Sequence, residues 1–288
     1  MSANVLFDAP GPRTRLRHRL YSLLGLALLA ALVAAVVLRF ADRGQLEYRL
    51  WEPFLTPEFD RALLVDGLLK TLQMAVLSIL FAVGFGLVFG VGKLSEHRFL
   101  RWPSWLVVEF FRAVPVLLMM YFLYFAYGVG KDGIGAYWCV VIALTVYNGA
   151  VLAEVFRAGI AAVPRGQAEA AYALGMRKSQ VMNIVLLPQA VKIMLPSIIS
   201  QCVVALKDTS LGFAIGAPGL TYVGKQIYGQ FQNQVQAALV VAAIYILVNL
   251  LLTGIATWVQ RRYVGEHKPL EPSMFGLTDA DTGATAMR

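Results

Sequence analysis

Two ionisable residues, Lys207 and Asp208, interrupt an otherwise apolar run that extends from residue 193 to residue 215. If that run crosses a bilayer, charged side chains within it are costly and indicate a function, such as binding a polar solute. Lys207 is suited to attract a carboxylate, with Thr209 and Ser210 lining the path beside it. A structural pairing of Lys207 with a carboxylate of the chain, or packing near a helix break, is the alternative.

Other polar residues occur at spacings that place them together on helices. Glu109 and Arg112 are three positions apart, as are Glu154 and Arg157, so each pair shares one helix face. We interpret both pairs as interface ion pairs or gate contacts at cytoplasmic helix ends. Asn148 lies inside another apolar run and is either an interhelical hydrogen-bonding residue, which we favour, or part of a solute path.

Two glycine-rich segments look like nucleotide-binding motifs but lack what those motifs require. Gly128–Gly133 spells GxGxxG without the surrounding strand–helix unit, and in Gly219–Lys225 the following Gln226 replaces the magnesium-binding Ser or Thr. Cys139 and Cys202 lie in separate apolar runs, and the three histidines are scattered. The sequence therefore predicts no catalytic residues, no metal site and no ATP site in this chain.

The composition predicts a membrane protein. Of the 288 residues, 58% are hydrophobic and 15% are charged, against about 25% charged in soluble proteins. A span needs about 20 apolar residues, and six runs satisfy this: Leu20–Leu38, Thr71–Gly92, Ala113–Gly130, Gly133–Ala153, Ile193–Ile215 and Ala237–Val259. Because these runs lack the alternation of barrel strands, we predict an all-α integral membrane protein with six transmembrane helices.

The distribution of Lys and Arg predicts the orientation. Most of the 25 basic residues lie in segments that share one side of the membrane if both termini are cytoplasmic. The net charge of +8 is then a consequence of topology, which argues against nucleic-acid binding. The predicted organisation is a cytoplasmic tail (1–19), an extra transmembrane helix (20–40), an extracellular loop (41–66), a membrane domain (67–262) and a second cytoplasmic tail (263–288).

A cytoplasmic loop of about thirty residues joins the fourth and fifth runs, which is too long for a simple connector. Pro164 can begin a helix there, and Gly175 can end it. Ala168, Ala171, Tyr172 and Gly175 follow helical spacing and form one face of mostly small residues. We interpret this face as a docking surface for another protein. An amphipathic helix lying on the membrane is the alternative.

These loop residues resemble the EAA loop of ABC importer permeases. The matching residues are Gln167–Ala171, the following Gly175, and Ile184 with Leu187 and Pro188. Further matches resemble the polar amino-acid branch of that family (histidine, glutamine, glutamate and arginine permeases), and they are Gly67–Leu72, Glu109–Pro115, Glu154–Arg157 and Leu206–Leu211. The resemblance covers about residues 67–261. Ala113, Val114 and Ala158 stand where the family usually has Gly, Thr and Gly.

The resemblance implies a type I importer core of five helices, preceded here by one more, with the EAA coupling loop at 158–190. It implies a permease subunit that carries a polar amino acid, glutamate or a similar one, across the cytoplasmic membrane of a bacterium. Such a subunit is not an enzyme and holds no cofactor itself. The residues that should contact the ATPase are Gly166, Gln167, Ala168, Glu169, Ala170, Ala171, Leu174 and Gly175.

The same resemblance implies three protein partners. They are a cytosolic ABC ATPase dimer that binds ATP and magnesium, a second permease subunit, identical or a sister chain, and an extracellular amino-acid-binding protein. An ion-gradient-driven secondary amino-acid transporter is the competing class. Such a transporter usually shows inverted repeats with broken helices in both halves, and no repeat is visible in this sequence.

Overall fold

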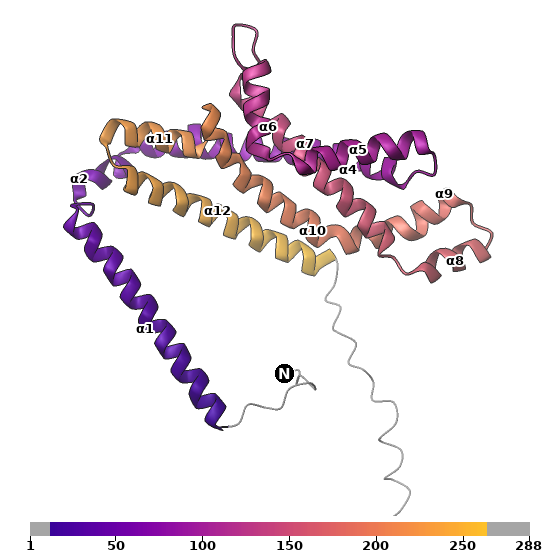
Figure 1. Cartoon of the computed structure of the whole chain (residues 1–288), viewed down its shortest axis with the longest axis horizontal. Helices are drawn as coiled ribbons and strands as arrows, with labels where there is room; N and C mark the ends of the chain where they lie inside the picture. Colours follow the sequence, from indigo (N-terminus) through magenta and orange to yellow (C-terminus); the bar gives the residue numbers. More distant parts are fainter. Residues whose placement is uncertain (1–11, 264–288) are drawn as a thin grey trace, which may run out of the picture.

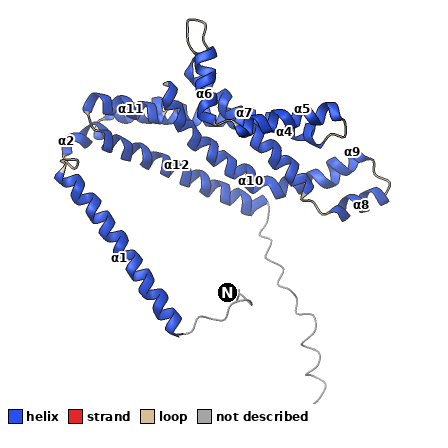
Figure 2. Ribbon diagram, in the orientation of Figure 1, coloured by secondary structure: helices blue, strands red, loops and turns tan. Residues whose placement is uncertain are grey.

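The computed structural model describes residues 12–263, and over this part of the chain it contains helices and turns but no strand (Figure 2). The α-helices are α1 (Pro12–Asp42), α2 (Tyr48–Trp51), α3 (Pro57–Arg61), α4 (Lys70–Leu94), α5 (Arg98–Ala113), α6 (Val116–Leu123), α7 (Gly135–Ala161), α8 (Arg165–Ala173), α9 (Lys178–Gln180), α10 (Leu187–Asp208), α11 (Leu220–Phe231) and α12 (Gln234–Tyr263). The 3-10 and π segments are η1 (Glu52–Leu55), η2 (Ala62–Leu69), η3 (Tyr124–Gly128), η4 (Val181–Leu186) and η5 (Thr209–Ile215).

Within the described residues, five continuous helical stretches are long and apolar enough to cross a membrane: Leu16–Asp42, Pro57–Leu94, Gly135–Ala161, Lys178–Ile215 and Gln234–Gln260. A sixth span results if the bent pair Arg98–Ala113 and Val116–Gly128 is counted as one. The fold is therefore the predicted all-α membrane architecture. One end of the bundle carries α2 and α11, while α8, α9 and the end of α12 lie toward the opposite end (Figure 1), which the predicted topology assigns to the cytoplasm.

The helices extend beyond two of the predicted apolar runs. The third apolar run, Ala113–Gly130, begins at a break, because α5 and α6 meet there at an angle of 98°. Val114 and Pro115 have extended backbones at this bend, and a residue before proline is disfavoured in the α conformation. The helical stretch that contains the second run begins at Pro57, so the predicted extracellular loop 41–66 is largely helical.

The centre of the bundle is the contact between α4 and α7. One face of α4 is buried, and every fourth residue along part of it is small: Ala82, Gly86 and Gly90. A Cβ added at Gly86 would lie 2.9 Å from the Cβ of Leu152 on α7. Small residues allow membrane helices to approach this closely. The α4–α7 pair therefore forms a rigid frame for the functional side chains.

Helix α1 lies apart from this frame (Figure 1), with nearly all its described side chains exposed. Polar contacts at the beginning of α12 hold the segment that follows α1. The Asn233 side-chain amide donates to the Leu50 carbonyl at 2.8 Å, and the Gln236 amide donates to the Gln45 carbonyl. Helix α1 is thus attached to the bundle only through the segment after its C-terminal end, within the described residues, and the rest of its surface is exposed.

Candidate translocation and coupling sites

Lys207 lies in a groove between α10 and α12 that polar and apolar side chains line together. The groove has a volume of about 460 Å³ and is lined by Val203, Lys207, Ser210, Tyr245, Ile246, Asn249, Leu250 and Thr253. Lys207 stands at the last turn of α10, where the helix tightens into the 3-10 segment η5. The predicted path residues Lys207 and Ser210 therefore share one groove, whose other wall is α12.

Lys207 has no ion-pair partner among the residues that the structure describes, and its side chain is exposed. The carboxylate pairing considered as an alternative is thus not formed with any described residue. Asp208 is half-buried and likewise has no ion-pair partner in the described part. A cation in a membrane span without an internal counter-ion is suited to a negatively charged ligand.

Sequence reasoning missed the residues of α12 that complete this groove. Tyr245, Asn249 and Thr253 are four positions apart, so they form a polar stripe on an otherwise apolar helix. The Asn249 amide donates to the Tyr245 carbonyl at 2.7 Å, while its buried Oδ1 accepts no hydrogen bond from a described residue. The regular spacing of polar residues in an apolar run is a signal that could have identified the stripe.

Thr209 and Asn148 do not line the groove. Thr209 is buried and donates its hydroxyl to the Leu206 carbonyl at 2.6 Å, so it stabilises the end of α10. Asn148 is buried on α7, where its Oδ1 accepts a hydrogen bond from Gln201 of α10 at 2.6 Å. The interhelical hydrogen bond that we favoured for Asn148 is therefore confirmed.

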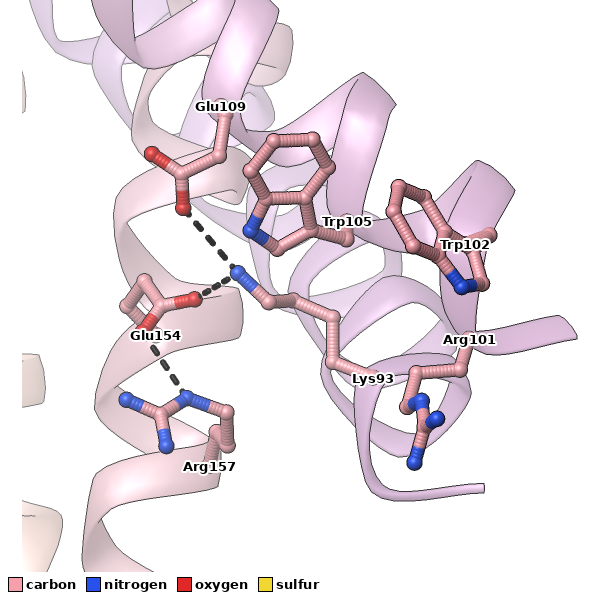
Figure 3. A pocket seen from close by; sticks show the side chains of 7 residues that line it. All are labelled: Lys93, Arg101, Trp102, Trp105, Glu109, Glu154 and Arg157. Atoms are coloured by element: carbon pink, nitrogen blue, oxygen red, sulfur yellow. Dashed lines mark hydrogen bonds and ion pairs between the residues drawn. The ribbon is translucent and has the colours of Figure 1, made fainter. Parts of the chain in front are cut away.

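The two predicted acid–arginine pairs form, and a lysine joins them; Figure 3 shows the contacts of Lys93 with both acids and of Glu154 with Arg157. The distance between Glu154 Oε2 and Arg157 Nε is 2.9 Å, and that between Glu109 Oε1 and Arg112 Nη1 is 3.4 Å. Lys93, at the end of α4, contacts both acids, at 3.1 Å to Glu109 and also to Glu154. Its side chain is only 7% exposed. The cluster therefore links α4, α5 and α7, a role for Lys93 that sequence reasoning missed.

The predicted coupling helix exists as α8, between Pro164 and Gly175. Gly175 has a φ of +76°, a left-handed conformation suited to glycine, and its N–H donates to the Tyr172 carbonyl at 2.9 Å. The predicted coupling residues are divided between two sides. Ala171 is buried and Ala168 half-buried, whereas the exposed members are Gly166, Gln167, Glu169, Ala170, Leu174 and Gly175.

The small-residue face of α8 therefore packs partly against the chain itself rather than facing outward as a whole. Ala171 is 4% exposed, and α8 packs on η4, whose Val181 is fully buried. A small side chain is needed there because the helix lies close to its own return segment. The outward surface includes Glu169 and Leu174, and Leu174 is 83% exposed.

A second cytoplasmic loop contacts the end of this region. Glu96, between α4 and α5, forms an ion pair with Lys178 of α9. Hydrogen bonding and charge attraction from Lys178 lower the pKa of the Glu96 carboxyl below its ordinary value. Gln189 Nε2 also lies 3.4 Å from Gln167 Oε1, which connects the start of α10 to α8. The coupling segment is thus connected to the first cytoplasmic loop and to α10.

Comparisons with known proteins show the family of the chain. Residues 82–265 match the family model described as the inner membrane component of binding-protein-dependent transport systems. The chain is 44% identical to the glutamate transport system permease protein GluD of Corynebacterium glutamicum, over 77% of this chain and 82% of that protein. It is 36% identical to a probable glutamine ABC transporter permease protein, GlnP of Bacillus subtilis, over 59% and 78%.

Solved structures show the same architecture. One chain, from the crystal structure of an amino acid ABC transporter with histidines, has a TM-score of 0.65 and 30% identity, covering 69% of this chain and 94% of that chain. A chain of the MetNI methionine ABC transporter in an inward-facing conformation, with a TM-score of 0.59 and 23% identity, shares the fold. The chain therefore belongs to the family of inner membrane components of binding-protein-dependent transport systems, the permease subunits of ABC importers.

Proposed function

We propose that this permease subunit carries glutamate, or a closely similar polar amino acid, through the groove between α10 and α12. Lys207 carries this assignment, because it is the exposed cation of that groove and has no counter-ion among the described residues. The 44% identical relative is named as a glutamate permease. A carboxylate of the substrate would supply the missing negative charge, and Ser210, Asn249 and Thr253 offer hydrogen bonds beside it.

The open side of the groove supports a second permease subunit. The polar side chains of this groove are stable within a membrane span when they face protein or water rather than lipid. An identical or sister subunit would close the groove and complete the path. An extracellular amino-acid-binding protein would deliver the substrate at the end of the bundle that carries α2 and α11.

The energy source would be a separate ATPase dimer that binds ATP and magnesium and docks on α8. The exposed Glu169 and Leu174 form the available contact surface there. Because α7 and α10 flank this loop and are joined by the Asn148–Gln201 hydrogen bond, a movement of α8 would be transmitted to the helix that carries Lys207. The coupling requires that the ATPase contact α8 differently in its two states.

The substrate assignment is tested by glutamate uptake into proteoliposomes that contain the chain with its ATPase and binding protein. We expect Lys207→Gln to reduce uptake at least tenfold, since a substrate charge then lacks its partner. Lys131→Gln is the matched control, because Lys131 is an exposed lysine outside the groove. Unchanged uptake by Lys207→Gln refutes the assignment.

The coupling assignment needs a separate test. We expect Glu169→Arg to abolish co-purification of the ATPase and glutamate-stimulated ATP hydrolysis. Asp132→Arg makes the same charge reversal in an exposed turn between η3 and α7, and should leave both unchanged. Uptake driven by an ion gradient in the absence of any ATPase would instead establish the secondary-transporter alternative.

A further inference from the structure

A second pocket lies beside the last turn of α4, and it shares no lining residue with the groove at Lys207. Its volume is about 470 Å³, and its lining residues come from α4, α5 and α7: Lys93, Arg101, Trp102, Trp105, Glu109, Glu154 and Arg157. Figure 3 shows Arg101 and Arg157 on either side of Lys93, with both indoles along one wall. Neither the substrate path nor the ATPase contact uses this pocket.

The carboxylates of the pocket are already neutralised by the chain. Lys93 contacts both acids, and Arg157 Nε binds the second oxygen of Glu154 at 2.9 Å. Arg101, by contrast, has no ion pair or hydrogen bond with another described residue, and only Nε of Arg157 is engaged. Three cations and two carboxylates line the pocket, so its lining keeps a net charge of +1. The guanidinium groups that remain unpaired among the described residues make the pocket suited to bind an anion.

The aromatic wall places this anion site at the membrane surface. Trp102 and Trp105 are 63% and 47% exposed, and their rings meet edge to face at 5.9 Å. Tryptophan is enriched at the headgroup level of bilayers. The neighbouring loop, residues 95–97, follows the last residue of a membrane span and precedes Arg98. The pocket is therefore located where the cytoplasmic leaflet presents its phosphates.

We propose that this pocket binds the phosphate group of an anionic phospholipid from the cytoplasmic leaflet. Arg101 and the terminal nitrogens of Arg157 would hold the phosphate, since guanidinium groups match phosphate oxygens in pairs. The indoles of Trp102 and Trp105 would pack on the glycerol and the first acyl carbons. Basic pockets between helices on the cytoplasmic side are suited to such headgroups. A bound lipid would connect α5 to α7 beside the Lys93 contacts.

The test measures lipid retention by native mass spectrometry of the detergent-purified full chain, titrated with phosphatidylglycerol or with zwitterionic phosphatidylcholine. We expect preferential retention of phosphatidylglycerol. Arg101→Gln should weaken the apparent affinity for this lipid about fivefold, which is the effect of losing one basic residue at the membrane surface. Arg98→Gln removes the same charge three positions earlier on α5, outside the pocket lining, and should have little effect.

Three results overturn the proposal. Equal weakening by Arg98→Gln and Arg101→Gln would show that lipid follows surface charge rather than this pocket. Equal retention of the two lipids would exclude an anion site. Displacement of phosphatidylglycerol by an equal concentration of inorganic phosphate would assign the pocket to a soluble anion. Trp102→Leu provides a second variant, expected to weaken retention without changing the charge.

Discussion

The ion-pair cluster of Lys93, Glu109, Arg112, Glu154 and Arg157 allows the most stringent test of how α4, α5 and α7 are held together. Lys93→Met keeps the length of the side chain but removes the ammonium that contacts Glu109 and Glu154. The lysine side chain is 7% exposed, and those of Glu154 and Glu109 are 19% and 40% exposed. The variant therefore leaves two carboxylates close together, one of them largely shielded from water.

Removing one partner of a fully buried ion pair costs roughly 3–5 kcal/mol. We expect a smaller loss, about 2 kcal/mol, because Arg157 and Arg112 still neutralise part of the charge and Glu109 is screened by solvent. For a chain of this size, a loss of that order corresponds to a decrease in Tm of about 4–8 °C. Thermal unfolding of the purified chain in detergent, followed by intrinsic fluorescence, measures it.

The double variant Lys93→Met/Glu154→Gln separates charge from packing. If the unpaired carboxylate causes the loss, neutralising Glu154 in the Lys93→Met background should recover part of the Tm. Lys131→Met provides the control at an exposed position. A decrease below 1 °C for Lys93→Met, or a double variant that is less stable than the single one, would refute the role assigned to Lys93.

Two further predictions concern helix contact and ionisation. Gly86→Ala should destabilise the chain by about 1–3 kcal/mol, because its Cβ would lie 2.9 Å from a side chain of α7; Gly84→Ala, with open space around it, should not lower Tm, and equal Tm values would contradict the packing described. The labelled Glu96 carboxyl should titrate below the ordinary glutamate pKa, because the ion pair with Lys178 favours its charged form. The pair then stabilises the loop contact above the ordinary pKa and loses this effect as pH falls through the lowered pKa, and Lys178→Gln should raise the midpoint in a carbon-13 NMR titration.

The membrane architecture and the family could be predicted from the sequence because their signals are local. Apolar runs of span length, basic residues on one side and the Gln167–Ala171 loop each lie in a single stretch of chain. The interpretation of Asn148 as an interhelical hydrogen-bonding residue also required only a polar group within an apolar run. The bend at Val114–Pro115 was missed even though its signal was local, because the proline lies inside a continuously apolar run.

The tertiary structure decided which side chains meet across helices. Lys93 lies 16 and 61 positions from the two acids that it contacts, and no periodicity relates residues so far apart. Ala171 faces inward because α8 folds back on η4, although its spacing alone placed it on one face with Tyr172, which is 49% exposed. Composition and periodicity determine what a segment can become, whereas the angle and register at which helices pack determine which charges find a partner and which, like Lys207 among residues 12–263, do not.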